Sequence, residues 1–424
     1  MSAYLCRIGD NMKEKIKVGL FVFIVIGVVI LNITYKNKNE VTKTKRKKQN
    51  NLAIIIKDAN GVETNSNDIP IGNYKINEEK THCENNGKIL SYDNTTGKIS
   101  FSFIGSDRCY LYFDYDSSID FFGIKIPLDT ELDSSGTSGT KYILSNENGL
   151  RYEGADPNNY ICLDNKTGGT CSDSSLLFRI IGLFEEDTSS DGTSSSGSKK
   201  LLKIIDTNNY GGTSGKYWNS AGANNWSTAS LKTELNGTYL TTLLGTSNVN
   251  SKLSSAIANA KWHLGGASKS NYETITAEGI YAEERNTSAI YSGYTGNPSS
   301  IYAKVGLMYP SDYGYATVGG STKNKSNCRN RALSGWGNTS YKDCKNNDWL
   351  FKSQSSFVND AEWLLSPYAS RSYNAAYFFY SGTVGLDGSV DNQFAVRPSI
   401  YLDSSILKIV GTGDGSSTNP YRIG

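Results

Sequence analysis

The chain has 424 residues, and its 43 Lys and Arg against 41 Asp and Glu give a formal net charge of +2. This length accommodates two or three domains with real hydrophobic cores. The balanced charge argues against a nucleic-acid-binding protein, because no overall basic field would attract phosphate. Gly (42) and Tyr (28) are abundant, whereas Pro (8) and Met (3) are scarce. Many short strands with polar turns have this composition, with Tyr as a half-buried strand residue; Tyr with Ser, Gly and Asn is also typical of binding loops.

Residues 18–35 (VGLFVFIVIGVVILNITY) form an uncharged apolar run at the lower length limit for a bilayer-spanning helix. Lysines precede the run, as in a signal sequence, but it is longer than a signal-peptide core and no small-residue cleavage site follows it. We therefore predict a single-pass transmembrane signal anchor in the cell membrane, rather than a cleaved signal peptide. Residues 1–17 would be a cytoplasmic N-terminus, and the basic residues 36–51 a disordered linker.

The orientation of this anchor is open from charge alone. Four Lys and Arg precede the apolar run and seven follow it, so the positive-inside rule would keep the C-terminal side in the cytoplasm. Long domains translocate largely regardless of charge, however, and the cysteine pattern described next favours an extracellular C-terminal part. Met12 is an alternative start, which would remove Cys6 from the chain.

Six of the seven cysteines fall into three local couples: Cys83 and Cys109, Cys162 and Cys171, and Cys328 and Cys344. No couple has C-x-x-C spacing, and the two histidines are too few for a Cys/His zinc site. We predict three disulfides in an oxidising compartment, no metal site and no cofactor. Buried free thiols are the alternative, and six cysteines allow fifteen connectivities.

Two folded parts are predicted after the linker. In residues 52–128, Ile99, Phe101 and Phe103 alternate with polar residues, and a second strand pattern (CYLYFDY) follows, which together indicate a small all-β module. Residues 129–140 (DTELDSSGTSGT) have the composition of a flexible hinge. Residues 141–424 would form the main domain, with a flexible C-terminal tail from about residue 411.

Within the main domain, residues 176–184 (LLFRIIGLF) and 201–206 (LLKIID) predict a β-hairpin around an exposed Ser/Gly loop. Short amphipathic helices are expected after Trp226, where leucines recur at helical spacing. The last strand pattern, residues 395–402, contains Pro398, which indicates an edge or bulged strand.

A series of weak motifs runs through this domain in a characteristic order: Phe178-Arg179-Ile180-Ile181-Gly182, Leu202–Asp206, Trp226-Ser227, Leu235-Asn236, Trp363-Leu364-x-Ser366-Pro367 and Val396-Arg397-Pro398. The series resembles an uncharacterised family of bacterial surface domains with a C-type-lectin-like fold, which is also the fold of formylglycine-generating enzymes. The resemblance covers residues 141–402. It implies an α+β fold, so that the whole chain would be a C-type-lectin-like domain preceded by a small all-β module and an N-terminal transmembrane helix.

The chain departs from this family at several points. The calcium-binding triplets Glu-Pro-Asn, Gln-Pro-Asp and Trp-Asn-Asp of lectins are absent, so calcium-dependent sugar binding is not implied. Relatives often have Arg where Leu365 stands. For Trp363, Arg397 and Pro398 the resemblance implies structural roles, with Trp363 in the core and Arg397 as a buried hydrogen-bonding clamp for a loop.

No group of residues predicts catalysis. His263 has no evident nucleophile partner, Glu185-Glu186-Asp187 indicates a solvated turn, and no G-x-x-x-x-G-K-[ST] phosphate loop occurs. We predict that the protein is not an enzyme.

The candidate ligand-binding face lies in residues 366–393. Its proposed residues are Tyr368, Arg371, Tyr373, Asn374, Tyr377, Tyr380, Asp387, Asp391, Asn392 and Gln393. Aromatic rings supply contact area, while Asn, Asp and Arg fix the orientation of a ligand. The sequence therefore favours a surface-displayed binding or adhesion protein for an extracellular glycan or protein. Solvent-facing strand residues without a ligand are the alternative for this face, and a structural, pilin-like subunit is the alternative for the chain.

Overall fold

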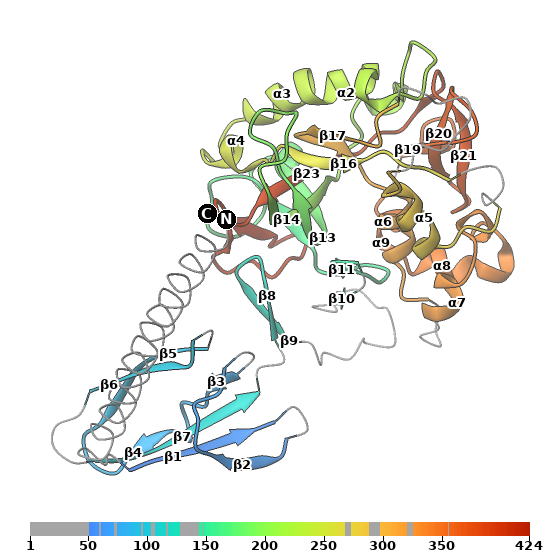
Figure 1. The fold of residues 1–424 in the computed structure, drawn as a ribbon. Coiled ribbons are helices and arrows are strands. Elements are labelled where there is room, and N and C mark those ends of the chain that lie inside the picture. The colour runs from blue at the N-terminus through green and yellow to red at the C-terminus, as the bar shows by residue number, and fades with distance from the viewer. Residues whose placement is uncertain are drawn as a thin grey trace, which may run out of the picture. The chain divides into compact units, whose positions relative to one another are not determined.

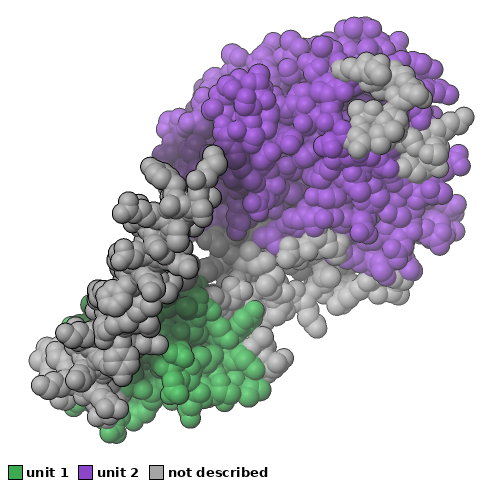
Figure 2. Space-filling view, in the orientation of Figure 1, with its two compact units in different colours: residues 1–117 green, residues 118–424 purple. Residues whose placement is uncertain are grey.

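The computed structural model describes residues 51–424 apart from 59–60, 72–73, 95, 103–106, 116–117, 128–143, 147, 268–272, 288–296, 320–324 and 355. The chain divides into two compact units, Met1–Ser117 and Ser118–Gly424 (Figure 2). The predicted anchor, nearly all of the basic linker and the predicted hinge lie outside the described residues. In the part of the chain that is described, no helix is both long enough and apolar enough to cross a membrane.

The predicted α+β class is wrong for this structure, which has more strand (36%) than helix (20%), and the predicted transmembrane helix lies outside the described residues. The leucine-rich segment after Trp226 forms only brief turns: α2 (Ser230–Glu234), the π-helix η4 (Leu235–Tyr239) and α3 (Leu240–Leu244). Even α5 (Ala277–Glu284) has only 8 residues. Gly, Ser and Asn recur every few positions, and these residues favour caps and turns over helix interiors.

Unit 1 is a small β module. Its main sheet consists of β1 (Asn51–Lys57), β2 (Glu63–Ser66), β3 (Tyr74–Ile76), β4 (His82–Cys83) and β7 (Arg108–Tyr115). β1 and β7 pair in parallel. The hairpin β5 (Lys88–Asp93)–β6 (Lys98–Ser102) contributes Ile89, Tyr92, Ile99 and Phe101, which pack on a core that includes Ile54, Leu111 and Phe113.

The main sheet of unit 2 has the strand order β18-β23-β14-β13-β12-β25-β24, and β11 (Leu150–Tyr152) also pairs with β13 and carries β10 (Leu144–Asn146) on its other side. Figure 1 labels the central strands β23, β14 and β13. The strands are β12 (Tyr160–Cys162), β13 (Leu177–Asp187), β14 (Ser198–Asp206), β18 (Val305–Leu307), β23 (Pro398–Asp403), β24 (Ile409–Val410) and β25 (Tyr421–Ile423). β13 and β14 are the predicted hairpin, and their continuous apolar runs are buried on both faces. β23 is not an edge strand: it lies between β14 and β18, and Pro398 is tolerated because it is the first residue of the strand.

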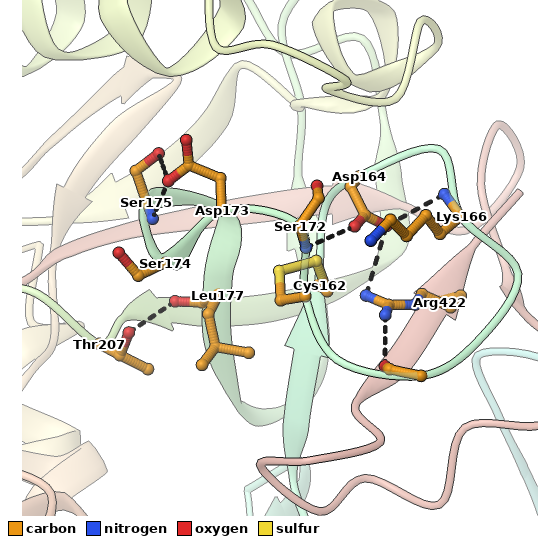
Figure 3. Close-up of a disulfide and its surroundings, with 12 residues drawn as sticks. Cys162, Asp164, Lys166, Ser172, Asp173, Ser174, Ser175, Leu177, Thr207 and Arg422 are labelled. Atoms are coloured by element: carbon orange, nitrogen blue, oxygen red, sulfur yellow. Dashed lines mark hydrogen bonds and ion pairs between the residues drawn. A yellow bond between two sulfur atoms is a disulfide. The ribbon is translucent and has the colours of Figure 1, made fainter.

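The C-terminal segment is not the flexible tail that the sequence indicated. β25 pairs in parallel with β12, and β24 pairs with β25. Arg422 is fully buried, with Nη1 3.3 Å from Asp164 Oδ1 and Nη2 donating to Gly169 O at 2.6 Å (Figure 3). The disulfide Cys162–Cys171 closes the loop that carries both of these acceptors. It therefore stabilises the loop against which the last strand packs.

Three disulfides form among the described cysteines, Cys83–Cys109, Cys162–Cys171 and Cys328–Cys344. These are the three predicted couples, which confirms the prediction of disulfides.

A second, three-stranded sheet consists of β19 (Ala361–Pro367), β20 (Asn374–Phe379) and β21 (Val384–Ser389), and β15 (Lys216–Tyr217) pairs separately with β22 (Gln393–Phe394). The remaining strands form two-stranded pairs, β8 (Ser118–Phe121) with β9 (Ile124–Pro127) and β16 (Ala260–His263) with β17 (Ser300–Ala303). The remaining helical turns are η1 (Ser174–Leu176), η2 (Gly212–Ser214), η3 (Trp226–Thr228), α4 (Leu253–Ala256), α6 (Pro310–Tyr315), α7 (Lys325–Arg329), η5 (Leu333–Gly335), η6 (Thr339–Tyr341), α8 (Lys342–Asn346) and α9 (Trp349–Lys352).

Candidate functional site

The apolar strand β19 is the base of the candidate face, and all seven of its residues are buried. Trp363 is fully buried, and its ring centroid lies 4.4 Å from that of Phe394. Its Nε1 donates to the main-chain oxygen of Lys216 at 2.9 Å. Trp363 therefore joins β19 to the β15–β22 pair, and it has no surface to offer a ligand.

Arg397 is also a structural residue, 2% exposed. Its Nε lies 3.0 Å from both carboxylate oxygens of Glu362, which is itself fully buried. Nη1 donates to Ser353 Oγ at 2.7 Å, and Nη2 donates to Leu350 O at 2.9 Å. Burial raises the pKa of the Glu362 carboxyl, and the charge of Arg397 opposes that rise. The planar guanidinium thus holds the end of α9 against β19.

The loop 367–373 follows β19 and is held by Asn224, a residue that is 1% exposed. Its Nδ2 lies 3.1, 2.8 and 2.8 Å from the main-chain oxygens of Tyr368, Arg371 and Asn374. Its own backbone N donates to Ser372 O at 2.7 Å. One buried amide therefore determines the path of the loop. The sequence analysis missed Asn224, because its position within a Gly/Asn-rich stretch carries no distinguishing signal.

Four predicted residues gather where β20 begins and β21 ends. Tyr373 is 47% exposed, and the guanidinium carbon of Arg371 lies 6.0 Å from the centre of its ring. Val390 N donates to Tyr373 O at 3.0 Å, and Asn392 N donates to Ser389 O at 2.8 Å. The turn 389–392, which carries the exposed Asp391 and Asn392, therefore lies beside the loop 367–373. We call this loop and turn together the tip.

Tyr377 and Asp387 lie further along the same strands. Tyr377 is half-buried, its Oη donates to Asp387 Oδ1 at 3.2 Å, and its ring packs 5.4 Å from that of Phe394. The register of β20 and β21 shifts between the pairs Ala375–Gly388 and Tyr377–Gly385. This irregularity turns Asp387 outward, as β-bulges commonly do.

The other predicted residues do not join the tip. Asn374 is 3% exposed and donates from Nδ2 to Asp387 O at 2.6 Å, so it is a structural residue. Gln393 is half-buried in the β15–β22 pair. Tyr380 is 54% exposed, but it lies seven residues from Tyr373 along an extended strand, roughly 23 Å away.

Tyr368 belongs to the loop of the tip, but it is only 5% exposed and lines a hollow. The free space of the hollow is about 390 Å³, part of it open to solvent. Its described lining consists of Leu264, Gly265, Gly266, Asn286, Asn297, Pro298, Ser299, Pro367, Tyr368 and Ala369. A side chain at Gly266 would collide with Pro367 O, and one at Gly265 with Glu283 O, so the glycine pair is needed for this close approach. These lining residues are apolar or carry an amide or a hydroxyl group, and none is charged.

A buried charged cluster lies next to the hollow. Glu186 is 6% exposed, with Oε2 3.0 Å from His263 Nε2 and Oε1 3.1 Å from Arg285 Nη2. The carboxylate of Glu284 accepts from Ser311 N and Ser311 Oγ, and burial raises its pKa to about 7. The solvated turn expected at residues 185–187 is therefore wrong for Glu186: β13 continues through it and carries it into an ion pair. His263 holds β13 and β16 together.

In comparisons with known proteins, the chain matches no protein-family model, no curated protein and no solved structure, and the resemblance to C-type-lectin-like surface domains stays a prediction.

Proposed function

We propose that this chain is a surface-displayed binding or adhesion protein that recognises an extracellular glycan or protein through the tip. The observation that carries this proposal is the contrast between backbone and side chains at the tip. The backbone is fixed by the buried Asn224 and by the bond from Val390 N to Tyr373 O. The side chains of Arg371, Tyr373, Asp391 and Asn392 are nevertheless exposed. Such preorganisation lowers the entropic cost of binding.

Two further features support the rest of the proposal. Three disulfides within the described residues are typical of a protein that functions outside the cytoplasm. Residues 18–35 would then hold the chain at the cell membrane. Glu186 and Glu284 are buried and already bonded to His263, Arg285 and Ser311, which favours binding over catalysis.

The proposal is tested with cells that produce the full-length chain. Adherence is measured to surfaces coated with mannan, chitin oligomers, collagen or fibronectin, for the natural chain and for Tyr373→Ala and Arg371→Ala. We expect the natural chain to adhere to at least one surface and each substitution to weaken that adherence about tenfold, the usual effect of losing an aromatic or Arg anchor. Equal adherence of all three chains would contradict the proposal, and filaments on the cells would favour the pilin-like alternative.

A further inference from the structure

Tyr217 is an exposed aromatic residue next to the tip that the sequence analysis did not select. It is 42% exposed and stands opposite Gln393 in the β15–β22 pair. Its neighbour Lys216 points elsewhere, since its Nζ pairs with Glu234 Oε2 at 2.6 Å. Tyr217 therefore presents an aromatic ring to solvent from a strand, and the strand fixes its backbone.

Two exposed tyrosines, Tyr373 and Tyr217, lie on segments that bond to the same residue of the tip, Val390. Val390 donates its N to Tyr373 O at 3.0 Å, and its own O accepts from Asn219 N at 2.9 Å. The segments that carry Tyr373 and Tyr217 are therefore both bonded to Val390 in the turn 389–392, which brings the two exposed tyrosines to the same part of unit 2.

The chemistry between the two tyrosines is polar and balanced in charge. Asp391 and Asn392 lie on the intervening turn and are both exposed, and Arg371 offsets the charge of Asp391. A carboxylate and an amide offer acceptors and donors to hydroxyl groups, while tyrosine rings offer flat apolar faces with a polar edge. Sugar rings present this same combination, with apolar C–H faces and hydroxyl edges. Because the tip is nearly neutral in charge, an uncharged glycan is a better ligand for it than an acidic glycan.

We propose that Tyr217 and Tyr373 are two stacking platforms that hold separate sugar units of one neutral glycan chain, with Asp391 and Asn392 bound to the hydroxyls between them. This inference rests on the proposed function and specifies its ligand as an oligosaccharide long enough to span both rings. A short sugar reaches one platform only. Once a longer oligosaccharide is bound to one ring, its other end is held close to the second ring and binds there easily. A long oligosaccharide should therefore bind more tightly than a short one.

The experiment measures how affinity depends on the length of the ligand. The full-length chain, held in lipid nanodiscs, is titrated calorimetrically with β-1,4-linked N-acetylglucosamine, β-1,4-linked glucose and α-linked mannose oligomers, from the disaccharide to the hexasaccharide. We expect one series to bind at least about tenfold more tightly as the hexasaccharide than as the disaccharide. Tyr217→Ala should abolish this gain, because the disaccharide and the hexasaccharide would then both reach Tyr373 alone, whereas Tyr217→Trp should keep the gain. Tyr302→Ala, in the half-buried strand β17, is the matched control and should also keep it.

The outcomes separate this inference from the proposed function. If no oligomer binds, but adherence to a protein-coated surface depends on Tyr373, the tip binds a protein and the glycan inference is overturned. If an oligomer binds without a gain in affinity with length, or Tyr217→Ala keeps the gain, the second platform does not exist. If Tyr373→Ala changes neither sugar binding nor adherence to any surface, the proposed function fails as well. A lower thermal stability of Tyr217→Ala alone would not alter the ratio of hexasaccharide to disaccharide affinity.

Discussion

The ring of Tyr377 occupies the space that a side chain at Gly385 would fill. A Cβ on Gly385 would lie 2.6 Å from both Cε1 and Oη of Tyr377, and a Cβ on Gly388 would lie 2.8 Å from its Cδ1. The tyrosine thus lies flat across the neighbouring strand β21, with its hydroxyl at Asp387. The main role of this half-buried ring is therefore to pack on β21, not to bind a ligand.

We expect Gly385→Ala to destabilise unit 2 by about 1–3 kcal/mol, because the added methyl must push the tyrosine ring away or shift the strand. Urea denaturation measures the change in the free energy of unfolding. Tyr377→Ala removes the obstacle, so Gly385→Ala should cost much less in that background, and the double-mutant cycle should show coupling. Additive effects of the two substitutions would mean that the ring and residue 385 do not compete for space.

The buried pair of Arg397 and Glu362 yields a second prediction. Arg397→Met leaves the fully buried Glu362 without its cation, and we expect a loss of about 3–5 kcal/mol in the free energy of unfolding. The double variant Arg397→Met/Glu362→Leu should lose less than Arg397→Met alone, because no uncompensated charge remains. Lys80→Ala is the control, since it breaks the exposed pair with Glu63 and should leave the free energy of unfolding nearly unchanged. Equal losses for the buried and the exposed pair would contradict this explanation.

Asn224 yields a prediction that concerns the tip. Asn224→Ala removes the amide that contacts the oxygens of Tyr368, Arg371 and Asn374, and we expect a loss of about 1–3 kcal/mol in stability. Hydrogen exchange should quicken at the backbone N–H groups of residues 368–374 more than in β13 or β14. Adherence should weaken although no exposed side chain has changed. Unaltered exchange in the loop would show that the β20–β21 pairing holds it without Asn224.

The parts of the fold that could be predicted from the sequence are those coded by neighbouring residues. The apolar runs of β13 and β14 lie close in the chain and flank one polar loop, and each disulfide joins cysteines that are close in sequence. The sequence predicts too much helix in the main domain, because leucines at helical spacing do not indicate how soon a helix ends. In the segment after Trp226, the helical turns are only a few residues long.

The parts that could not be predicted depend on contacts between distant residues. Arg422 lies in a polar, glycine-rich C-terminal segment, and only its burial against Asp164, which is 258 positions away, makes that segment a strand. Tyr217 and Asn224 join the candidate site through bonds to residues more than 140 positions later. Of the ten predicted binding residues, Arg371, Tyr373, Asp391 and Asn392 gather at the tip. Asn374 and Tyr368 are buried, since alternation along a strand cannot show which face a second sheet covers.

Two buried carboxyl groups yield the pH prediction. Burial raises the pKa of Glu284 to about 7, against the opposing effects of Arg285 and Ser311, and it raises the pKa of Asp206 to about 6. In the unfolded chain these groups titrate near 4.5 and 3.8. The folded state therefore holds protons that the unfolded state has lost, so the stability contributed by both groups is fully present below about pH 4 and is lost as the pH rises through 6 and 7. The low pKa of Asp312, about 2, acts in the opposite direction, but only in strong acid.

We therefore expect the free energy of unfolding of unit 2 to fall between pH 5 and pH 8, with Glu284 contributing about 3 kcal/mol of the change. Urea denaturation at several pH values measures the slope. Glu284→Gln keeps an uncharged side chain of the same size beside Ser311, so it should flatten the slope and make unit 2 more stable at pH 8 than the natural chain is. Glu185→Gln, one residue before the buried Glu186 and exposed on β13, should leave the slope unchanged. If the free energy of unfolding of Glu284→Gln still falls with pH as steeply as that of the natural chain, Glu284 is ionised in the folded state throughout this range. In that case Arg285 stabilises the carboxylate more strongly than burial destabilises it.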